Sequence, residues 1–324
     1  MFKSKTTIFI QYVLFLLVGY FLVRHCFKNI NLNELIEKLK SGNYYIAFPV
    51  LLISLLVYFF RIQRWNILLN SLEIPVKKSN QFIALSLCYL VNFAVPRFGE
   101  IIRAIVLKRR DKVAINESLA TIVFERTADL FCLGILTVVA LFSETYQHSD
   151  VVIQFAKKAS KINFSTTILL LFFLCILVAI GILIKLLKKK NIVSLWISGF
   201  ISSFKKLLKI KHISRFSFYT ILIWFCYYLM TYLWFFTFTD SSSLSFYKAF
   251  QVMLIGTFAR TIPVQAGSAG VYHNAVSYTL NLMGLSLITG NALAIIIHGF
   301  QTLFTITIGT IAYILFVFRR QKQL

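Results

Sequence analysis

Three ionisable side chains follow a proline in a stretch of the chain that is otherwise strongly apolar. Residues 92–110 read NFAVPRFGEIIRAIVLKRR, in which Arg97, Glu100 and Arg103 fall within two helical turns after the proline. Charged groups at membrane depth are costly, so by default they mark a functional site. Because guanidinium groups can donate two parallel hydrogen bonds to phosphate oxygens, Arg97 and Arg103 predict a phosphate-binding site.

A second interruption follows at Thr261–Gly270, TIPVQAGSAG, where a proline and glycines again separate two apolar arms. Interrupted hydrophobic segments at corresponding places in two halves of a chain indicate a transport site. Helices are expected to restart near Arg97 and near Ser268, so that each kink presents free backbone N–H groups and a positive dipole end to an anion. The glycines have an alternative explanation, because small residues also permit close helix packing in membranes.

The two kinks together predict a lipid phosphate held between them, with the lipid tails still in the bilayer. Rocking of one half of the protein against the other would expose this site to each leaflet in turn. No catalytic residue, metal ligand or cofactor is expected. The candidate substrate-binding residues are Arg97, Gly99, Glu100, Arg103, Arg260, Gly267, Ser268 and Gly270.

A charge network is expected to support this site. The run TIVFERTADLF places Glu125, Arg126 and Asp129 inside one apolar helix, with the two carboxylates on one face. An alternative is that all these charges only pair with one another and hold helices together. His273 and His298 complete the network, either as groups that titrate near neutral pH and couple transport to protons, or as buried, hydrogen-bonded histidines.

The composition is that of a polytopic membrane protein. Of 324 residues, 58% are hydrophobic and 14% are charged, and the mean hydropathy is +0.78. The net charge of +23 comes mostly from short loops between apolar runs, which favours anionic lipid headgroups over nucleic acid. The five cysteines lie singly, so neither a disulfide framework nor a zinc site is predicted.

The elements that position these residues form an all-α fold of about six spanning helices and two re-entrant helical hairpins. The spans are expected at Thr7–Val23, Tyr44–Phe60, Ser118–Phe142, Thr166–Leu187, Phe216–Phe238 and Thr289–Phe318. The arms Gln81–Val95 and Gly99–Leu107 are too short to cross about 30 Å at 1.5 Å per residue, which predicts a re-entrant hairpin. The somewhat longer arms Phe246–Ile262 and Val271–Leu285 predict a second one.

Two amphipathic helices are expected to lie on the membrane surface. A short one has apolar residues at helical spacing from Leu32 to Leu39, and residues 190–213 combine an apolar stripe with a basic face. Trp65, just beyond the second span, is typical of an interfacial anchor.

Charge asymmetry sets the expected sidedness. With the amino terminus in the cytoplasm, inside segments hold 24 of the 34 Lys and Arg, including Arg61 and Arg64, against 8 in outside segments. Both termini are therefore expected in the cytoplasm.

A single membrane domain, 1–324, would then consist of two inverted repeats. The first repeat, 1–143, contains the hairpin 81–110, and the second, 164–324, contains the hairpin 246–286. The first hairpin would enter from the cytoplasm and the second from outside.

Three motifs resemble the lysylphosphatidylglycerol synthase transmembrane-region family, over nearly the whole chain. They are a Pro-Arg-x-Gly-Glu pattern that begins at Pro96, a Glu-Arg-x-x-Asp pattern that begins at Glu125, and a glycine motif with Pro263, Gly267 and Gly270. The resemblance implies a flippase-like protein of the bacterial inner membrane, similar to the flippase half of the multiple peptide resistance factor.

Two positions depart from the pattern of that family. It usually carries a glutamate after the last glycine motif, where this chain has His273, and tends to carry an arginine in the first half of the last span, where His298 stands. The chain also ends at Leu324 without the soluble aminoacyl-transfer domain of the full-length synthases, so we do not expect it to make aminoacylated lipid by itself.

The leading hypothesis is a flippase that moves an anionic, phosphate-bearing lipid between leaflets and is not an enzyme. Its partners would be membrane lipids, either an anionic phospholipid or a polyprenyl-phosphate lipid, and homo-oligomerisation stays open. One alternative is an intramembrane enzyme that transfers a lipid headgroup, with Glu125 and Asp129 as its clearest carboxylate pair. Another is an accessory subunit of an envelope lipid or glycan assembly system, without transport of its own.

Overall fold

The computed structural model describes residues 31–142, 191–261 and 265–321, and within these ranges the chain forms helices and turns with no strand. The helical fold class predicted from the sequence is confirmed. Two predicted spans, Thr7–Val23 and Thr166–Leu187, lie outside the described residues. The two inverted repeats therefore stay a prediction.

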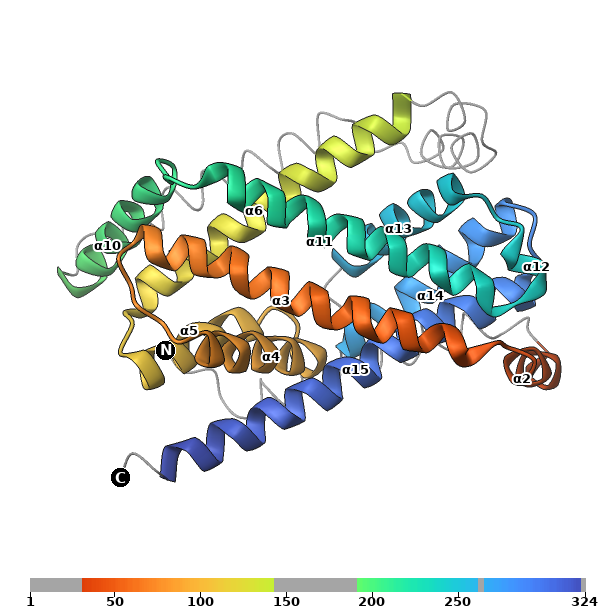
Figure 1. Ribbon diagram of the computed structural model, residues 1–324, viewed down its shortest axis with the longest axis horizontal. Helices are drawn as coiled ribbons and strands as arrows, with labels where there is room; N and C mark the ends of the chain where they lie inside the picture. Colours follow the sequence, from red (N-terminus) through yellow and green to blue (C-terminus); the bar gives the residue numbers. More distant parts are fainter. Residues whose placement is uncertain (1–30, 143–190, 262–264, 322–324) are drawn as a thin grey trace.

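Most of the helices are long, and several are joined by turns of only a few residues. In chain order they are α2 (Leu32–Lys40), η1 (Tyr44–Ile46), α3 (Ala47–Ser71), α4 (Lys78–Ala94), α5 (Gly99–Asp111), α6 (Ile115–Phe142), α10 (Asn191–Leu207), α11 (Ile213–Trp234), η2 (Phe235–Thr237), α12 (Thr239–Ser242), α13 (Phe246–Thr261), α14 (Gln265–Leu282) and α15 (Leu287–Gln321). Figure 1 shows α3, α11 and α15 running roughly along the longest axis of the molecule.

Three of the described segments are long and apolar enough to cross a membrane. They are Tyr44–Ser71, Ile213–Thr237 and Leu287–Phe318, with 28, 25 and 32 residues. Each exceeds the roughly 20 residues that a helix needs to cross the hydrocarbon core. The helix α6 also has the length of a span, 28 residues, but its middle carries three charged side chains.

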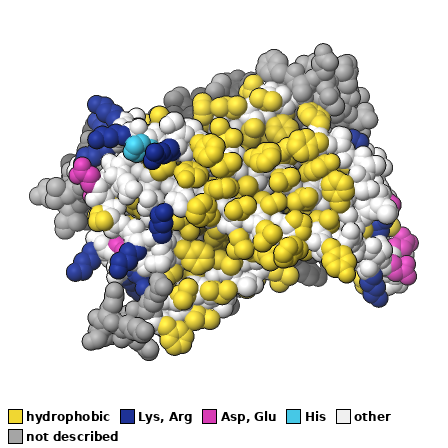
Figure 2. All heavy atoms as spheres, viewed as in Figure 1, with side chains coloured by type: hydrophobic (Ala, Val, Ile, Leu, Met, Phe, Trp, Pro, Cys, Tyr) yellow, Lys and Arg dark blue, Asp and Glu magenta, His cyan; other side chains and the backbone are white. Residues whose placement is uncertain are grey.

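The surface agrees with a membrane location. Figure 2 shows a broad apolar belt across α3 and α11, with basic side chains gathered at the end that carries α10 and the carboxyl terminus. Exposed apolar side chains of these two helices include Leu55 and Phe59 of α3 and Ile221 and Phe225 of α11. Such an apolar surface is what lipid tails cover in a membrane protein, whereas a soluble monomer rarely exposes one.

The short helix α2 forms where the sequence predicts it, at the opposite end of the molecule. Its Leu35 is buried in the main core and Leu39 packs against the same core, whereas Ile36 stays exposed. Lys38 forms an ion pair with Asp240 of α12, and its hydrogen bond holds the pKa of that carboxyl group below its usual range. This contact fastens α2 to the end of the helical core.

The basic helix predicted over 190–213 forms as α10 and ends at Leu207. The ring of Phe204 lies 5.8 Å from that of Phe124 on α6, and Leu207 is fully buried. Lys205 and Lys206 are exposed. The apolar stripe of this helix is therefore covered at least in part by protein, while its basic face is free to meet lipid headgroups.

The predicted role of Trp65 as an interfacial anchor is wrong. The helix α3 continues to Ser71, eleven residues beyond the predicted end of the span, so Trp65 is 0% exposed and its indole N–H donates to Thr121 at 2.9 Å. Arg61 and Arg64 are likewise helix residues rather than loop residues. Without these two arginines the inside segments still hold 22 Lys and Arg against 8 outside.

The segments α4 and α5 form a helical hairpin, packed against each other through a tight turn. Their 17 and 13 residues reach about 25 and 20 Å at 1.5 Å per residue. At the turn, Arg97 has a left-handed backbone with φ of 67°. The side-chain oxygen of Asn92 accepts a hydrogen bond from the Gly99 N–H at 2.7 Å and so closes the turn.

Gly99 permits this close packing, and its replacement by alanine tests the point. An added Cβ would lie 2.0 Å from the Cys88 carbonyl oxygen, which is backbone and cannot rotate away. We expect Gly99→Ala to lower the free energy of unfolding by about 3 kcal/mol, at the upper end for overpacking. Gly134→Ala is the control, because nothing lies within 4 Å of its added Cβ and alanine favours a helix by up to about 1 kcal/mol. Equal thermal stability of the two variants in detergent would contradict the packing role.

The helices α13 and α14 pack against each other as a second hairpin. Residues 262–264 between them lie outside the described part. Gly256 of α13 gives room to Tyr272 of α14, whose ring would meet an added Cβ at 2.8 Å. Whether either hairpin is re-entrant in a membrane stays a prediction.

Candidate functional site

A cavity of about 500 Å³ lies where the two hairpins meet the long helices α3, α6, α11 and α15. Its polar wall contains Arg61, Arg97, Arg126 and Arg260, together with one carboxylate, that of Glu100. Four guanidinium groups thus converge on one space from four different parts of the chain. The rest of the wall is largely apolar or aromatic.

The tips of the two hairpins touch at this cavity. The Arg97 guanidinium at the tip of the first hairpin donates a hydrogen bond of 2.9 Å to the backbone carbonyl of Thr261, the last residue of α13. Arg260 lies on the same end of α13, with its guanidinium 4.3 Å from the centre of the Tyr272 ring. Among the described residues neither arginine has a carboxylate partner. Both are therefore available to an anion.

Arg126 and Glu100 form the third side of the cavity. The Arg126 Nη2 atom lies 3.0 Å from Glu100 Oε1, and the second carboxylate oxygen accepts from the Asn92 amide at 3.2 Å. The Arg126 side chain is still 36% exposed. Some N–H groups of its guanidinium can therefore donate to a bound group while Glu100 holds the side chain in place.

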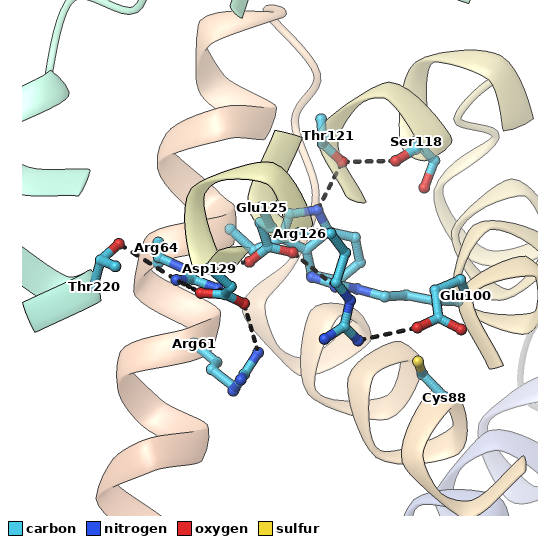
Figure 3. A network of polar contacts seen from close by, with 12 residues as sticks. Arg61, Arg64, Cys88, Glu100, Ser118, Thr121, Glu125, Arg126, Asp129 and Thr220 are labelled. Atoms are coloured by element: carbon cyan, nitrogen blue, oxygen red, sulfur yellow. Dashed lines mark hydrogen bonds and ion pairs between the residues drawn. The ribbon is translucent and has the colours of Figure 1, made fainter. Parts of the chain in front are cut away.

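The remaining charges of the predicted network do not line the cavity. Figure 3 shows Glu125 and Asp129 next to Arg64. Arg64 donates to Asp129 at 2.6 and 3.1 Å and lies 3.5 Å from Glu125. The other oxygen of Glu125 lies 2.7 Å from Arg103. These carboxylates hold arginines of neighbouring helices, which is the structural pairing that the sequence left open.

Arg103 does not reach the cavity, although its spacing suggests a phosphate ligand. It is 2% exposed, and its guanidinium stacks on the Trp65 ring, 3.5 Å from the centroid. Desolvated and paired, this arginine joins α5 to α3 and α6. We therefore treat it as a residue that positions the first hairpin.

The backbone groups at the first kink are less free than the sequence suggests. The helix α5 begins at Gly99 rather than near Arg97, and the Gly99 N–H is already taken by Asn92. Gly267 and Ser268 belong to α14, which begins at Gln265, but the Ser268 side chain lies outside the described part. The carbonyl of Gly270 accepts from Asn274. The anion-binding capacity of this site therefore lies mainly in its arginines.

The two histidines are neighbours. The rings of His273 and His298 lie 5.0 Å apart, and that of His298 lies 5.5 Å from Tyr272. His298 lines the cavity. Their proximity joins α14 to α15 and places one imidazole at the edge of the arginine cluster.

Sequence reasoning missed two members of the site. Arg61 is 9% exposed and donates to the Tyr227 hydroxyl at 3.0 and 2.7 Å, while Arg64 is fully buried. The sequence predicts a loop for both arginines, because a span of ordinary length would end before them. The sequence feature that indicates a longer helix is the apolar character of the chain on both sides of these two arginines, which continues to Leu69.

A comparison with protein families decides where this chain belongs. The family model for the lysylphosphatidylglycerol synthase TM region matches residues 8–309. The chain belongs to this family. Neither a curated protein nor a solved structure matches it.

Membership in the lysylphosphatidylglycerol synthase TM region family ties this membrane protein to lipid handling. The motif residues that carried the resemblance are not scattered. Arg97 and Glu100 line the cavity, and the Glu-Arg-x-x-Asp motif of α6 sends Arg126 into it while Glu125 and Asp129 turn away. Two of the three family motifs thus build one wall of the cavity and its support.

Proposed function

We propose that this protein is a flippase that carries an anionic, phosphate-bearing lipid between the two leaflets of a membrane. The observation that carries the proposal is the convergence of Arg61, Arg97, Arg126 and Arg260 on one cavity at the hairpin tips. Guanidinium groups bind phosphate through charge-assisted hydrogen bonds, which are about twice as strong as neutral ones. The cavity therefore suits a phosphodiester better than a neutral headgroup.

The shape of the site supports transport rather than simple lipid binding. Each hairpin contributes an arginine near its turn, and among the described residues Arg97 of the first hairpin donates a hydrogen bond to the Thr261 carbonyl of the second. A movement of one half against the other would break this hydrogen bond. Inverted repeats that meet at broken helices are a recurrent plan for alternating access.

The orientation we propose follows from the charge at the two ends of the molecule. The end with α10 and the carboxyl terminus carries most basic side chains on the face in Figure 2 and would lie in the cytoplasm of a bacterial cell. Anionic headgroups of that leaflet would then meet the exposed Lys205 and Lys206 of α10.

The headgroup-transferring enzyme receives less support. Such an enzyme needs an acid or base within reach of its substrate. Glu125 and Asp129 are engaged by arginines and do not line the cavity, and Glu100 is held by Arg126 and Asn92. The arrangement fits the binding of an anion better than proton transfer.

Reconstitution of the pure protein tests the proposal. Vesicles with the protein should move a fluorescently labelled phosphatidylglycerol from the inner to the outer leaflet, as measured by chemical quenching from outside, faster than protein-free vesicles. A labelled phosphatidylcholine, whose headgroup is zwitterionic, should move more slowly. Equal rates with and without protein would favour an accessory subunit. A new lipid species in the mass spectrum would favour an enzyme.

A further inference from the structure

The charge of the cavity limits which headgroups it can hold. Four guanidinium groups and one carboxylate line it, a net of three positive charges. Nine of the eleven Asp and Glu in the sequence lie among the described residues, and of these nine Glu100 alone lines the cavity. Its two oxygens already accept from Arg126 and Asn92. A cationic group in this space would find no free carboxylate among the described residues.

The charged side chains next to the cavity that do not line it leave its net positive charge unchanged. Glu125 and Asp129 are matched by Arg64 and Arg103, with distances of 2.6 to 3.5 Å, so they present little net field to the cavity. Repulsion between like charges at partly buried sites is only weakly screened by salt. The cavity should therefore exclude an ammonium group and attract an anion.

Three of the five threonines that line the cavity add a second requirement. The hydroxyl of Thr231 donates to the Tyr227 carbonyl at 2.9 Å, that of Thr257 to Met253 at 2.7 Å, and that of Thr261 to its own helix. All three line the cavity. Because each hydroxyl proton is already donated to a backbone carbonyl, each oxygen can only accept from a ligand.

The arginines and these threonines require different kinds of hydrogen-bond partner. Arginines are donors without acceptors, so they match phosphate oxygens, whereas the threonine oxygens need an O–H or N–H donor. A phosphodiester alone satisfies the arginines and leaves the threonines unmatched. Neutral hydroxyls beside the phosphate satisfy both sets, and an ammonium group would donate only against the net positive charge.

We infer that the cavity selects a phosphodiester headgroup that carries neutral hydroxyls, of the phosphoglycerol or phosphosugar kind, over a headgroup that carries an ammonium group. This inference rests on the proposed function of the same cavity and specifies its substrate class. An aminoacylated phosphoglycerol, with its added positive charge, would be a poor substrate.

Three probe lipids separate the two requirements. Phosphatidylglycerol has one negative charge and two hydroxyls, phosphatidylmethanol has the same charge without hydroxyls, and lysylphosphatidylglycerol keeps the phosphate and one hydroxyl and adds two ammonium groups. The purified full chain in detergent should bind phosphatidylglycerol about tenfold or more tightly than lysylphosphatidylglycerol, by native mass spectrometry and thermal stabilisation. Phosphatidylmethanol should fall between them. Translocation rates in vesicles should follow the same order.

A pair of variants tests the threonine contribution. Thr257→Val and Thr261→Val keep the side-chain shape and remove the acceptor, so each should reduce the preference for phosphatidylglycerol over phosphatidylmethanol. Discrimination against lysylphosphatidylglycerol should stay. The matched control is Thr137→Val on α6, whose hydroxyl makes the same kind of bond to Leu133 at 2.8 Å but does not line the cavity.

Binding and transport distinguish failure of the inference from failure of the proposed function. Equal or tighter binding of lysylphosphatidylglycerol overturns the headgroup preference, even if lipids are translocated. The expected binding order without translocation of any probe keeps the preference and overturns the flippase. Unchanged selectivity in both cavity-facing threonine variants removes the hydroxyl requirement from the inference.

Discussion

Replacing Arg64 by alanine is expected to lower the stability of the folded protein by about 3–5 kcal/mol, the usual cost of breaking a buried ion pair. The Arg64 side chain is 0% exposed and makes two hydrogen bonds to Asp129. Without it, Asp129 keeps, among the described residues, a distant contact with Arg61 at 3.9 Å. A carboxylate left with so weak a partner inside the helical core is the reason for the large effect. Thermal or denaturant unfolding of the pure protein in detergent measures it.

Two comparisons make this test specific. Arg109→Ala removes the same charge from an exposed position at the end of α5 and should change the stability by less than about 0.5 kcal/mol. The double variant Arg64→Ala/Asp129→Ala should be less unstable than the sum of its single variants, because it leaves no carboxylate alone. Additive losses, or an Arg64→Ala protein as stable as the control, would show that the pair does not hold α3 to α6.

Replacing Arg97 by glycine is expected to slow lipid translocation by roughly tenfold or more, while the stability of the folded protein changes by less than about 1 kcal/mol. A hydrogen bond to a charged group contributes about 1.5–3 kcal/mol, which corresponds to the loss of rate. The backbone at Arg97 has φ of 67°, a conformation that costs a residue with a side chain about 1–2 kcal/mol and suits glycine. The side-chain hydrogen bond to the Thr261 carbonyl is lost, and this loss offsets the gain from the backbone. A large loss of translocation rate with little change in stability would separate a ligand role from a structural one.

Further variants sharpen the result. Arg97→Lys keeps the charge but not the two-pronged donor geometry, so its rate should lie between those of the wild type and Arg97→Gly. Arg260→Ala, on the other hairpin, should slow translocation as well. Arg109→Ala serves again as the control. Translocation by Arg97→Gly at the wild-type rate would remove this residue from phosphate binding.

The sequence identified the two hairpins because they depend on local signals. Apolar arms interrupted at Pro96 and by the glycines of 261–270 predict two kinks, and helices end on both sides of each. The close packing at the α4–α5 turn could not be predicted from the hydropathy pattern. It depends on Asn92 reaching the Gly99 N–H and on the missing Cβ at that glycine.

The end of α3 could not be predicted in the same way. A stretch with two arginines resembles a loop when only local hydropathy is considered, so Arg61 and Arg64 were placed outside the span. Inside the fold, Arg64 meets Asp129, 65 residues further along the chain, and Arg61 meets Tyr227, 166 residues away. These partners make a charged helix segment tolerable in the core.

The sequence by itself determined that this is an α-helical membrane protein with a cluster of arginines and carboxylates near two broken segments, because hydropathy, proline and glycine act locally. Only the tertiary structure decided which arginine serves which purpose. Arg97 and Arg260 face a cavity without a carboxylate partner among the described residues, whereas Arg64 and Arg103 are neutralised behind it. The difference lies in which side chain of a distant helix comes within about 3 Å, and spacing along the chain carries no such information.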